Sequence, residues 1–206
     1  MNDYSEHSNR QSPTSREVLE DSADELGPVL ARFLYGIAGP FSEAQLDSLI
    51  LTPSRWARAL IDMTAGYEED PKEILQRSFE QEFDQMIVVP DIDFTSLCEH
   101  HLLPFTGRAV VGYIPSNGRV VGLSKIPRLV DCFARRLQLQ ERMTKQIADA
   151  LEEELDPLAV GVILQAQHQC MTCRGVKKLN ASMVTSDLRG EFRHDSQARS
   201  EFLSFR

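Results

Sequence analysis

Two short segments contain the residues best suited to chemistry, Cys98-Glu99-His100-His101 and His168-Gln169-Cys170. Cys98 and His101 are three residues apart, a spacing that lets both side chains of a tight turn bind a single soft cation. Cys170 would supply a third ligand. Three protein ligands on Zn²⁺ leave the fourth tetrahedral position for water, as in hydrolytic zinc sites. The two segments therefore predict a zinc site with an open position.

Cys173 permits a different site, because Cys170-Met171-Thr172-Cys173 is a C-x-x-C pattern. Together with Cys98 and His101 it would form a closed Cys₃His structural site. Such a site would belong to a non-catalytic, zinc-stabilised oligomeric binding module. Against this alternative, the two halves lie roughly seventy residues apart on separate predicted strands, whereas compact zinc knuckles use neighbouring turns. We expect Cys173 to point away, because three residues along a strand reverse the facing of a side chain.

Two further histidines flank the candidate ligands. Adjacent residues of an extended segment face opposite sides, so His100 would face away from a metal bound by His101. His168 and Cys170 are two apart on a predicted strand and would share a face. Histidines without a metal can transfer protons near neutral pH. Either His100 or His168 alone could be structural, but both beside a zinc-bound water favour proton transfer.

Other residues could bind an anion and a purine. Ser124 and Lys125 begin a predicted helix, Arg128 follows one turn later and Arg174 follows the second cysteine pair. A helix N-terminus with such cations suits phosphates, although no P-loop pattern is present and ordinary surface cations would look the same. Gln140-Glu141 lies early in the next helix. A carboxylate there could accept two hydrogen bonds from a guanine-type ring, a weak signal taken alone.

The charge of the chain is uneven. Of 206 residues, those up to Leu97 include 7 Lys and Arg against 19 Asp and Glu, whereas the rest include 15 against 12. An overall net charge of -9 argues against general nucleic-acid binding, which needs a broad basic surface. Basic residues concentrated in one part of an acidic chain favour a pocket for a small anion, with scattered surface charge as the alternative.

The pattern of apolar residues predicts three regions. Residues 1–15 contain few apolar side chains and are expected to be a disordered tail. Residues 16–83 form a helical region in which Arg55 and Arg58 share one helix face. Residues 84–206 are predicted to form two strands, two helices and two further strands. The last two strands are expected to run from Leu158 to Cys170 and from Asn180 to Gly190. This order predicts an α+β fold, an antiparallel sheet with helices on one face.

The sheet and the composition also bear on assembly and location. A four-stranded sheet leaves open edges that often pair between subunits, so we expect an oligomer. Four unevenly spaced cysteines indicate reduced thiols. No apolar run approaches the ~20 residues that span a bilayer, and no signal peptide is present. We therefore expect a cytoplasmic protein without a membrane partner.

From Thr52 onward the chain resembles the GTP cyclohydrolase I family. The matching segments are TPSRWARAL, SLCEHHLLPFTG, VGYIP, GLSKIPRLVDCFARRLQLQERMTKQIA, HQCMTCRGV and TSDLRGEF. The order of CEHH, GLSK, QER and H-x-C-x-x-x-R-G is very specific. The first fifty residues match only loosely, and Cys173 falls where the family generally has a residue that is not a ligand.

The resemblance implies a fold, an assembly and a reaction. The fold is the tunnel fold, a ββααββ unit, here with an N-terminal helical extension, and the assembly is a decamer of two stacked pentamers with active sites at subunit interfaces. The reaction is the zinc-dependent opening of the imidazole ring of GTP at C8, which releases formate and forms 7,8-dihydroneopterin triphosphate, the first step of pterin and folate biosynthesis. A tunnel-fold relative that acts on another purine or pterin is an alternative, and Glu141 with an intact CEHH argues against it.

The resemblance also implies a role for each candidate residue. The zinc ligands are Cys98, His101 and Cys170, and the proton-transfer histidines near C8 are His100 and His168. Glu141 is the guanine anchor, with Gln140 beside it. The triphosphate contacts are Ser124, Lys125, Arg128 and Arg174, and a neighbouring subunit contributes Arg55 and Arg58.

Overall fold

The computed structural model describes residues 16–38, 42, 45, 47, 49–76 and 78–206. The expected disordered tail, residues 1–15, lies outside the described residues. The chain divides into two compact units at the bond between Asp62 and Met63. Among the described residues, no helix is both long and apolar enough to cross a membrane.

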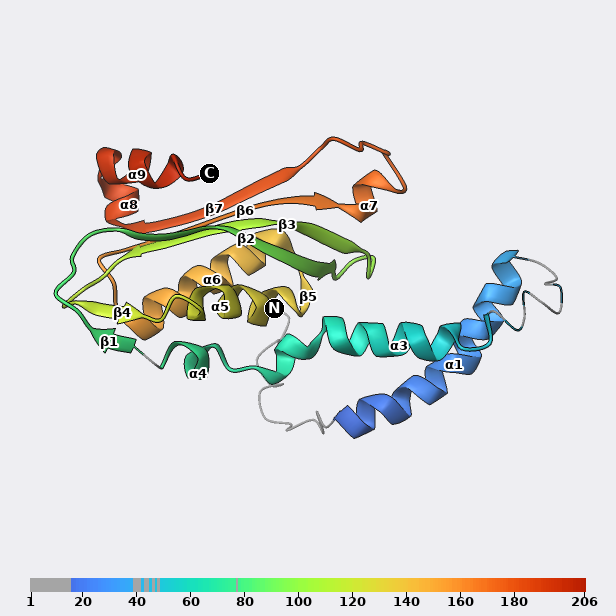
Figure 1. The fold of residues 1–206 in the computed structure, drawn as a ribbon. Helices are drawn as coiled ribbons and strands as arrows, with labels where there is room; N and C mark the ends of the chain where they lie inside the picture. The colour runs from blue at the N-terminus through green and yellow to red at the C-terminus, as the bar shows by residue number, and fades with distance from the viewer. Residues whose placement is uncertain (1–15, 39–41, 43–44, 46, 48, 77) are drawn as a thin grey trace, which may run out of the picture. The chain divides into compact units, whose positions relative to one another are not determined.

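The first unit contains two long helices, α1 (Arg16–Ala38) and α3 (Thr52–Met63), whose last residue begins the second unit (Figure 1). The start of α3 at Thr52 agrees with the sequence, because the fixed φ and missing N–H of Pro53 suit a first helical turn. Pro53 and Ala57 are buried. Arg55 and Arg58 are exposed, so both guanidinium groups are accessible in this unit.

The second unit contains short N-terminal elements, the main sheet and the helices packed on it. In chain order they are η1 (Ala65–Glu68), α4 (Pro71–Leu75), β1 (Ser78–Glu80), β2 (Ile87–Cys98), β3 (Pro104–Ile114), β4 (Arg119–Val121), α5 (Lys125–Ala134), β5 (Leu137–Gln138), α6 (Gln140–Leu155), β6 (Ala159–His168), α7 (Gln169–Thr172), β7 (Met183–Gly190), α8 (Glu191–His194) and α9 (Ser196–Leu203).

The main sheet has the strand order β5-β2-β3-β6-β7, and a separate small sheet pairs β1 with β4. The pairs β2–β3, β3–β6 and β6–β7 are antiparallel, which confirms the predicted sheet. The two-residue strand β5 adds a parallel pair at the edge, where Cys98 faces Gln138. In Figure 1, α5 and α6 lie together against one face of this sheet, as expected for a ββααββ unit.

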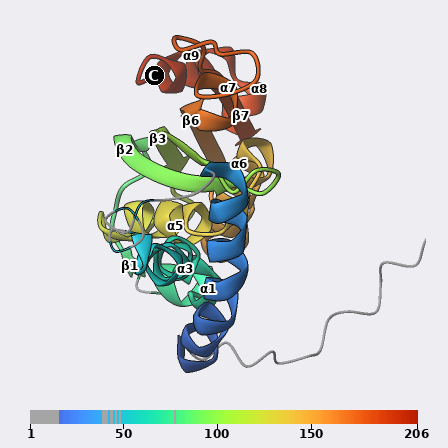
Figure 2. The ribbon, with the colours of Figure 1, turned by 90° about the vertical axis from the view of Figure 1, so that its right-hand side faces the viewer.

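Alternation along the strands gives the sheet two apolar faces. On β6, Val160, Val162 and Leu164 belong to the large core with α5 and α6, whereas Ala159 and Ile163 belong to a smaller core. That smaller core is completed by C-terminal aromatic rings. In the views of Figure 1 and Figure 2, α8 and α9 accordingly lie on the sheet face opposite α5 and α6. The sequence placed helices on one face only, and these two short helices cover part of the other.

Residues 63–76 and 78–83, which the sequence grouped with the N-terminal helices, belong to the second unit. Arg136 explains how: its Nε donates to the carbonyl oxygen of Gly66 at 2.9 Å, and its guanidinium lies over the ring of Tyr67. The backbone N–H of Gly66 donates to the carbonyl oxygen of Arg135 at 2.9 Å. This segment is therefore fixed to the end of α5, close to the edge strand β5.

Candidate active site

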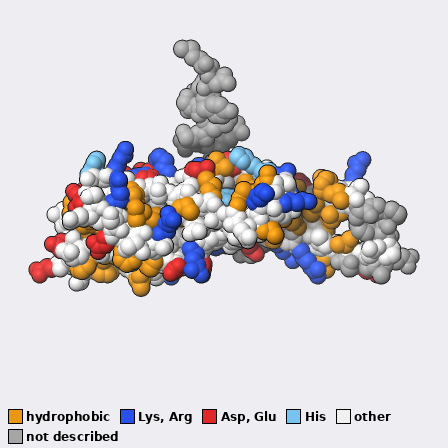
Figure 3. Space-filling view, turned by 90° about the horizontal axis from the view of Figure 1, so that it is seen from above, with side chains coloured by type: hydrophobic (Ala, Val, Ile, Leu, Met, Phe, Trp, Pro, Cys, Tyr) orange, Lys and Arg blue, Asp and Glu red, His pale blue; other side chains and the backbone are white. Residues whose placement is uncertain are grey.

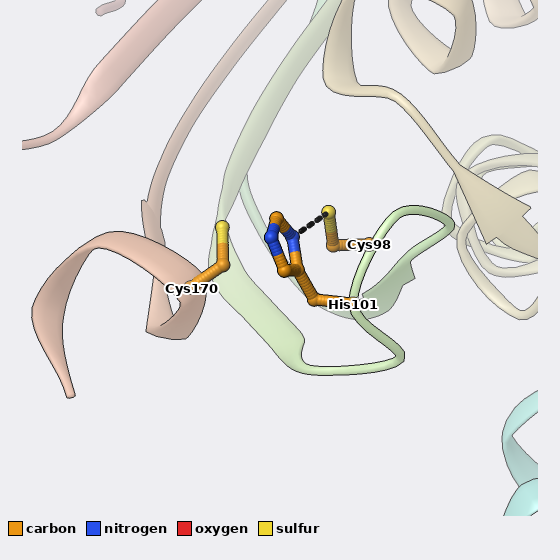
Figure 4. Close-up of side chains that lie close together, drawn as sticks. All are labelled: Cys98, His101 and Cys170. Atoms are coloured by element: carbon orange, nitrogen blue, oxygen red, sulfur yellow. Dashed lines mark hydrogen bonds between the residues drawn. The ribbon is translucent and has the colours of Figure 1, made fainter. Parts of the chain in front are cut away.

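The predicted metal ligands come together at one end of the main sheet. Cys98 is the buried last residue of β2, and His101 lies in the turn that follows, where its N–H donates to the carbonyl oxygen of Cys98 at 3.2 Å. Figure 4 shows the imidazole of His101 between the sulfur atoms of Cys98 and Cys170. The Sγ of Cys98 is 3.7 Å from Nδ1 of His101, and the three ligand atoms lie within 4.8 Å of one another.

This Cys98–His101–Cys170 cluster could hold a metal ion, and it is the one such group in the described part of the chain. Around a tetrahedral zinc ion with bonds of about 2.0–2.3 Å, neighbouring ligand atoms are roughly 3.5–3.8 Å apart. Small side-chain rotations would bring the cluster to that size. Burial raises the pKa of the Cys170 thiol, and the neighbouring Cys98 raises it further, because two thiolates side by side repel each other. A cation between them would reverse that effect.

The strand predicted to end at Cys170 ends two residues earlier, at His168. Its partner β3 begins at Pro104, so the pair formed by Phe105 and His168 is the last one in the ladder. Without a partner strand the chain turns into the short helix α7, which contains Cys170. His168 and Cys170 therefore do not share a strand face as the sequence suggested, and the turn of α7 brings the thiol to the cluster.

Cys173 lies outside the Cys98–His101–Cys170 cluster. It follows α7, is exposed, and its Sγ donates to the carbonyl oxygen of Gln169 at 3.0 Å. Alternation along a strand does not determine its direction, because this segment is helical. The helical turn gives Cys173 its position instead.

His168 is half-buried and contacts protein groups on two sides. Its ring stacks on that of Phe105 with 4.5 Å between centroids and 4° between planes. Its Nε2 lies 2.8 Å from Oε1 of Gln140. Burial lowers the pKa of His168, and the nearby carboxylate of Glu141 partly opposes this. Glu141 itself is exposed, so its carboxylate is accessible, and its effect on the pKa of His168 shows that the two side chains are near each other.

Arg174 and His100 border the cluster. Arg174 is exposed, and its Nη1 lies 3.4 Å from Nε2 of His101. The exposed His100 ring has its centroid 6.3 Å from that of His101, and its Nε2 is 3.9 Å from Glu99. The protomer thus brings the candidate ligands together with both histidines, Glu141 and Arg174.

The sequence reasoning did not assign three residues that hold this arrangement in place. Phe105 supports the ring of His168 from the buried side. Arg142, directly after Glu141, donates a hydrogen bond to the carboxylate of Glu99, in the turn between the candidate ligands Cys98 and His101. Glu99 and Arg142 stand within the quoted CEHH and QER motifs, but pairing them required the fold. Nothing in the spacing of Phe105 indicated its contact with His168.

The cations at the start of α5 are separated from the Cys98–His101–Cys170 cluster by the length of that helix. The N–H of Val121, at the end of β4, donates to the hydroxyl of Tyr113, which pairs with Ile87 at the beginning of β2. From there α5, about 15 Å long, leads back toward β5, which pairs with β2 at Cys98. Ser124 is the N-cap residue of α5, but its side chain makes no capping hydrogen bond. Ser124, Lys125 and Arg128 are therefore not neighbours of the Cys98–His101–Cys170 cluster in one protomer.

Lys125 and Arg128 instead line an open pocket of about 550 Å³ whose other charged groups include Glu69 and Asp70. Arg55 and Arg58 belong to the first unit. Of the predicted phosphate contacts, only Arg174 borders the Cys98–His101–Cys170 cluster. Ser124, Lys125 and Arg128 lie elsewhere in the second unit, and Arg55 and Arg58 lie in the first unit. On the face shown in Figure 3, the described basic side chains are interspersed with other types and form no continuous basic surface.

Comparison with known proteins identifies the family. The family model described as GTP cyclohydrolase I matches residues 41–206. The GTP cyclohydrolase 1 of Chlorobium phaeovibrioides is 45% identical over 188 residues, covering 91% of this chain and 81% of that protein. The enzyme of the same name from Bacteroides thetaiotaomicron is 51% identical over 163 residues, covering 79% of this chain and 82% of that protein. The one from Porphyromonas gingivalis is 53% identical over 159 residues, covering 77% of this chain and 81% of that protein. The chain therefore belongs to the GTP cyclohydrolase I family.

Proposed function

We propose that this protein is a zinc-dependent hydrolase that opens the imidazole ring of GTP at C8, releases formate and forms 7,8-dihydroneopterin triphosphate. The observation that carries the proposal is the Cys98–His101–Cys170 cluster beside His168 and Glu141. This reaction would be the first step of pterin and folate biosynthesis. The low cysteine count and the absence of a bilayer-length apolar run in the sequence support a cytoplasmic location.

The donor set favours zinc. Two thiolates and one imidazole match the soft ligands that zinc prefers, and three ligands are typical of catalytic rather than structural sites. Zinc held there would supply activation of water at neutral pH, by lowering its pKa toward ~7. Cys173 has its own hydrogen bond to Gln169, so the closed Cys₃His site is not favoured.

The neighbouring residues would bind and protonate the purine. Glu141 would accept hydrogen bonds from N1–H and the 2-amino group of guanine through its two carboxylate oxygens. His168 would transfer a proton to the imidazole part of the base, which makes C8 electrophilic. The exposed His100 would serve as a second proton carrier, and Arg174 would contact the phosphates.

The separation of Lys125 from the cluster supports active sites shared between copies. Because α5, about 15 Å long, lies between Lys125 and the edge strand β5 that pairs with Cys98, we infer that Lys125 serves the triphosphate of a GTP bound at another copy. A second copy would bring Ser124, Lys125 and Arg128 to the triphosphate, and Arg55 and Arg58 would come from a neighbouring subunit. The edge strands β5 and β7 are available for pairing. We propose a homodecamer of two stacked pentamers as the assembly.

An assay with GTP tests the proposal. Metal-replete protein should release formate and, after oxidation, give a fluorescent pterin. Chelation should abolish both products, and Zn²⁺ should restore them. Cys98→Ala should be inactive, whereas Thr95→Val, an exposed position on the same strand, should retain activity. No turnover by metal-replete protein would indicate the binding module, and turnover of another purine or pterin in preference to GTP would indicate a different reaction.

A further inference from the structure

The imidazole of His168 is held in one orientation by two contacts. Stacking on Phe105, whose side chain is fully buried, fixes the plane of the ring. The 2.8 Å contact between Nε2 of His168 and Oε1 of Gln140 fixes the direction of the ring within that plane. The environment of Gln140 therefore decides which nitrogen of His168 carries hydrogen.

The hydrogen-bond partners of Gln140 determine the orientation of its amide. This side chain is 1% exposed, so its polar groups depend on protein partners. Its Nε2 lies 3.0 Å from the carbonyl oxygen of Leu164 and 3.1 Å from that of Met183. Carbonyl oxygens only accept hydrogen bonds, so the amide NH₂ must face them. The amide oxygen then faces His168 and can only accept, which requires hydrogen on Nε2 of His168.

Two threonine hydroxyls extend this arrangement. Oγ1 of Thr185 is 3.1 Å from Nε2 of Gln140 and 2.7 Å from Oγ1 of Thr144. Thr144 donates to the backbone carbonyl oxygen of Gln140 at 2.7 Å. Because Thr144 uses its one hydrogen for that carbonyl oxygen, Thr185 donates to Thr144, and the two amide hydrogens of Gln140 are shared among Thr185 and the two carbonyl oxygens. The chain of hydrogen bonds starts and ends on Gln140, and it opposes rotation of the amide by half a turn.

We propose that Gln140, supported by Thr185 and Thr144, is a positioning residue that keeps neutral His168 in the tautomer with hydrogen on Nε2. The nitrogen left to exchange a proton with a ligand is then Nδ1. The other tautomer would place two acceptors, Nε2 and the amide oxygen, against each other in a buried site. The role of His168 in proton transfer rests on the proposed function, but its tautomer does not.

The tautomer can be measured without turnover. Protein with its bound metal and ¹⁵N-labelled histidine is studied by solid-state NMR at a pH where His168 is neutral, and the His168 signals are identified by their loss in His168→Gln. Hydrogen on Nε2 and a bare Nδ1 are expected. Hydrogen on Nδ1 in the unmodified protein overturns the proposal. Because no substrate is present, this result is independent of whether GTP is the substrate.

Variants test the support. Gln140→Met removes the amide at similar length and is expected to give mixed tautomers and a kcat lower by about 10- to 100-fold, with KM changed less than about 2-fold. Thr185→Val should lower kcat by about 10-fold with a partial shift in tautomer, and Thr185→Ser, which keeps the hydroxyl, should restore both. Thr95→Val is the matched control on an exposed strand position.

Two outcomes contradict this role. Unchanged tautomer signals in both Gln140→Met and Thr185→Val would show that another contact sets the tautomer. Equal losses of kcat in Thr185→Val and Thr185→Ser would show that the side chain acts by packing alone. If Gln140→Met does not fold, the Thr185 pair decides. Failure of GTP turnover with hydrogen found on Nε2 would reject the proposed function while supporting the positioning.

Discussion

Arg142, in the first turn of α6, donates a hydrogen bond to the carboxylate of Glu99, in the turn that contains two ligands of the metal cluster. This hydrogen bond lowers the pKa of Glu99. The same guanidinium donates to the carbonyl oxygen of Leu137 at 3.0 Å and, through Nε, to Oε1 of Gln138 at 3.2 Å. Arg142 therefore connects the metal-binding turn to the edge strand and to the helix that presents Glu141.

Replacing Arg142 by Met should weaken metal binding without unfolding the protein. The methionine keeps much of the aliphatic stem but loses the fork of donors, so the turn becomes freer to move. Residues that orient metal ligands typically contribute 10- to 100-fold to affinity, and we expect about 10-fold for this exposed contact. Competition with a chromophoric chelator measures it. Lys145→Met, which replaces an exposed cation on the same helix, is the control. Equal metal affinities in the two variants would show that Arg142 does not support metal binding.

The two cysteines of the C-x-x-C pattern should respond differently to substitution. Cys170→Ala removes a ligand and should abolish bound metal and turnover, since two remaining ligands hold zinc poorly. Cys173→Ala removes an exposed thiol bonded to Gln169 and should leave both nearly intact. Metal content by elemental analysis and formate release by assay are compared. Loss of metal from Cys173→Ala would instead support the closed Cys₃His site that includes Cys173.

Mixing two inactive variants should restore activity if copies share active sites. Lys125→Ala lacks a proposed phosphate contact, and His168→Ala lacks a proposed proton carrier beside the Cys98–His101–Cys170 cluster. In hetero-oligomers formed by refolding or co-expression, some sites combine an intact Lys125 with an intact His168. Random pairing gives about a quarter of wild-type activity. Activity no higher than that of the separate variants would mean that one copy forms a complete site.

Gly66 should not tolerate a side chain. A Cβ at this position would lie 2.3 Å from the carbonyl oxygen of Cys132 and 2.8 Å from that of Arg135. Both are backbone atoms, so rotation of a side chain cannot relieve the overlap. Gly66→Ala should lower the free energy of unfolding by about 2–3 kcal/mol in denaturant titrations. Gly36 in α1 is the control, because a Cβ there would have no neighbouring atom within 4 Å. Gly36→Ala should leave the free energy of unfolding unchanged or raise it by up to about 1 kcal/mol.

Asp149 should make stability depend on acid pH. Burial opposes its ionisation, but hydrogen bonds from Lys145 and Arg189 lower the pKa of Asp149 overall. The stabilisation it gives is therefore present above the unfolded pKa of about 3.9 and lost as the pH falls through the lower folded value.

Asp149→Asn should accordingly lower Tm at pH 7 by about 3 °C, which corresponds to roughly 1 kcal/mol for a lost hydrogen bond to charge. The difference from the unmodified protein should shrink below about pH 4. Thermal melts followed by circular dichroism across pH 2–7 test this. Glu153→Gln, an exposed change on the same helix, should show no such narrowing. A difference that stays constant with pH would exclude ionisation of Asp149 as the cause.

Local patterns were sufficient for many elements. Asp195 is a residue type that commonly caps helices, and its side chain accepts a hydrogen bond from the N–H of Gln197 at the start of α9. Asp70 caps α4 in the same way. The three-residue spacing of Cys98 and His101 predicted a turn that brings both side chains together, and they meet there. These features depend on residues close in sequence, whose geometry a short segment decides by itself.

The sequence by itself therefore determined the α+β order, the strand alternation and the identity of the cluster residues. Only the tertiary structure decided that β6 ends at His168, because that end depends on where β3 begins. It also decided that Gln140 faces His168 across 28 residues and that the length of α5 separates Lys125 from the strand that pairs with Cys98. These relationships depend on strand register and helix packing between distant segments. Such long-range contacts form only when the whole core folds, and no local spacing encodes them.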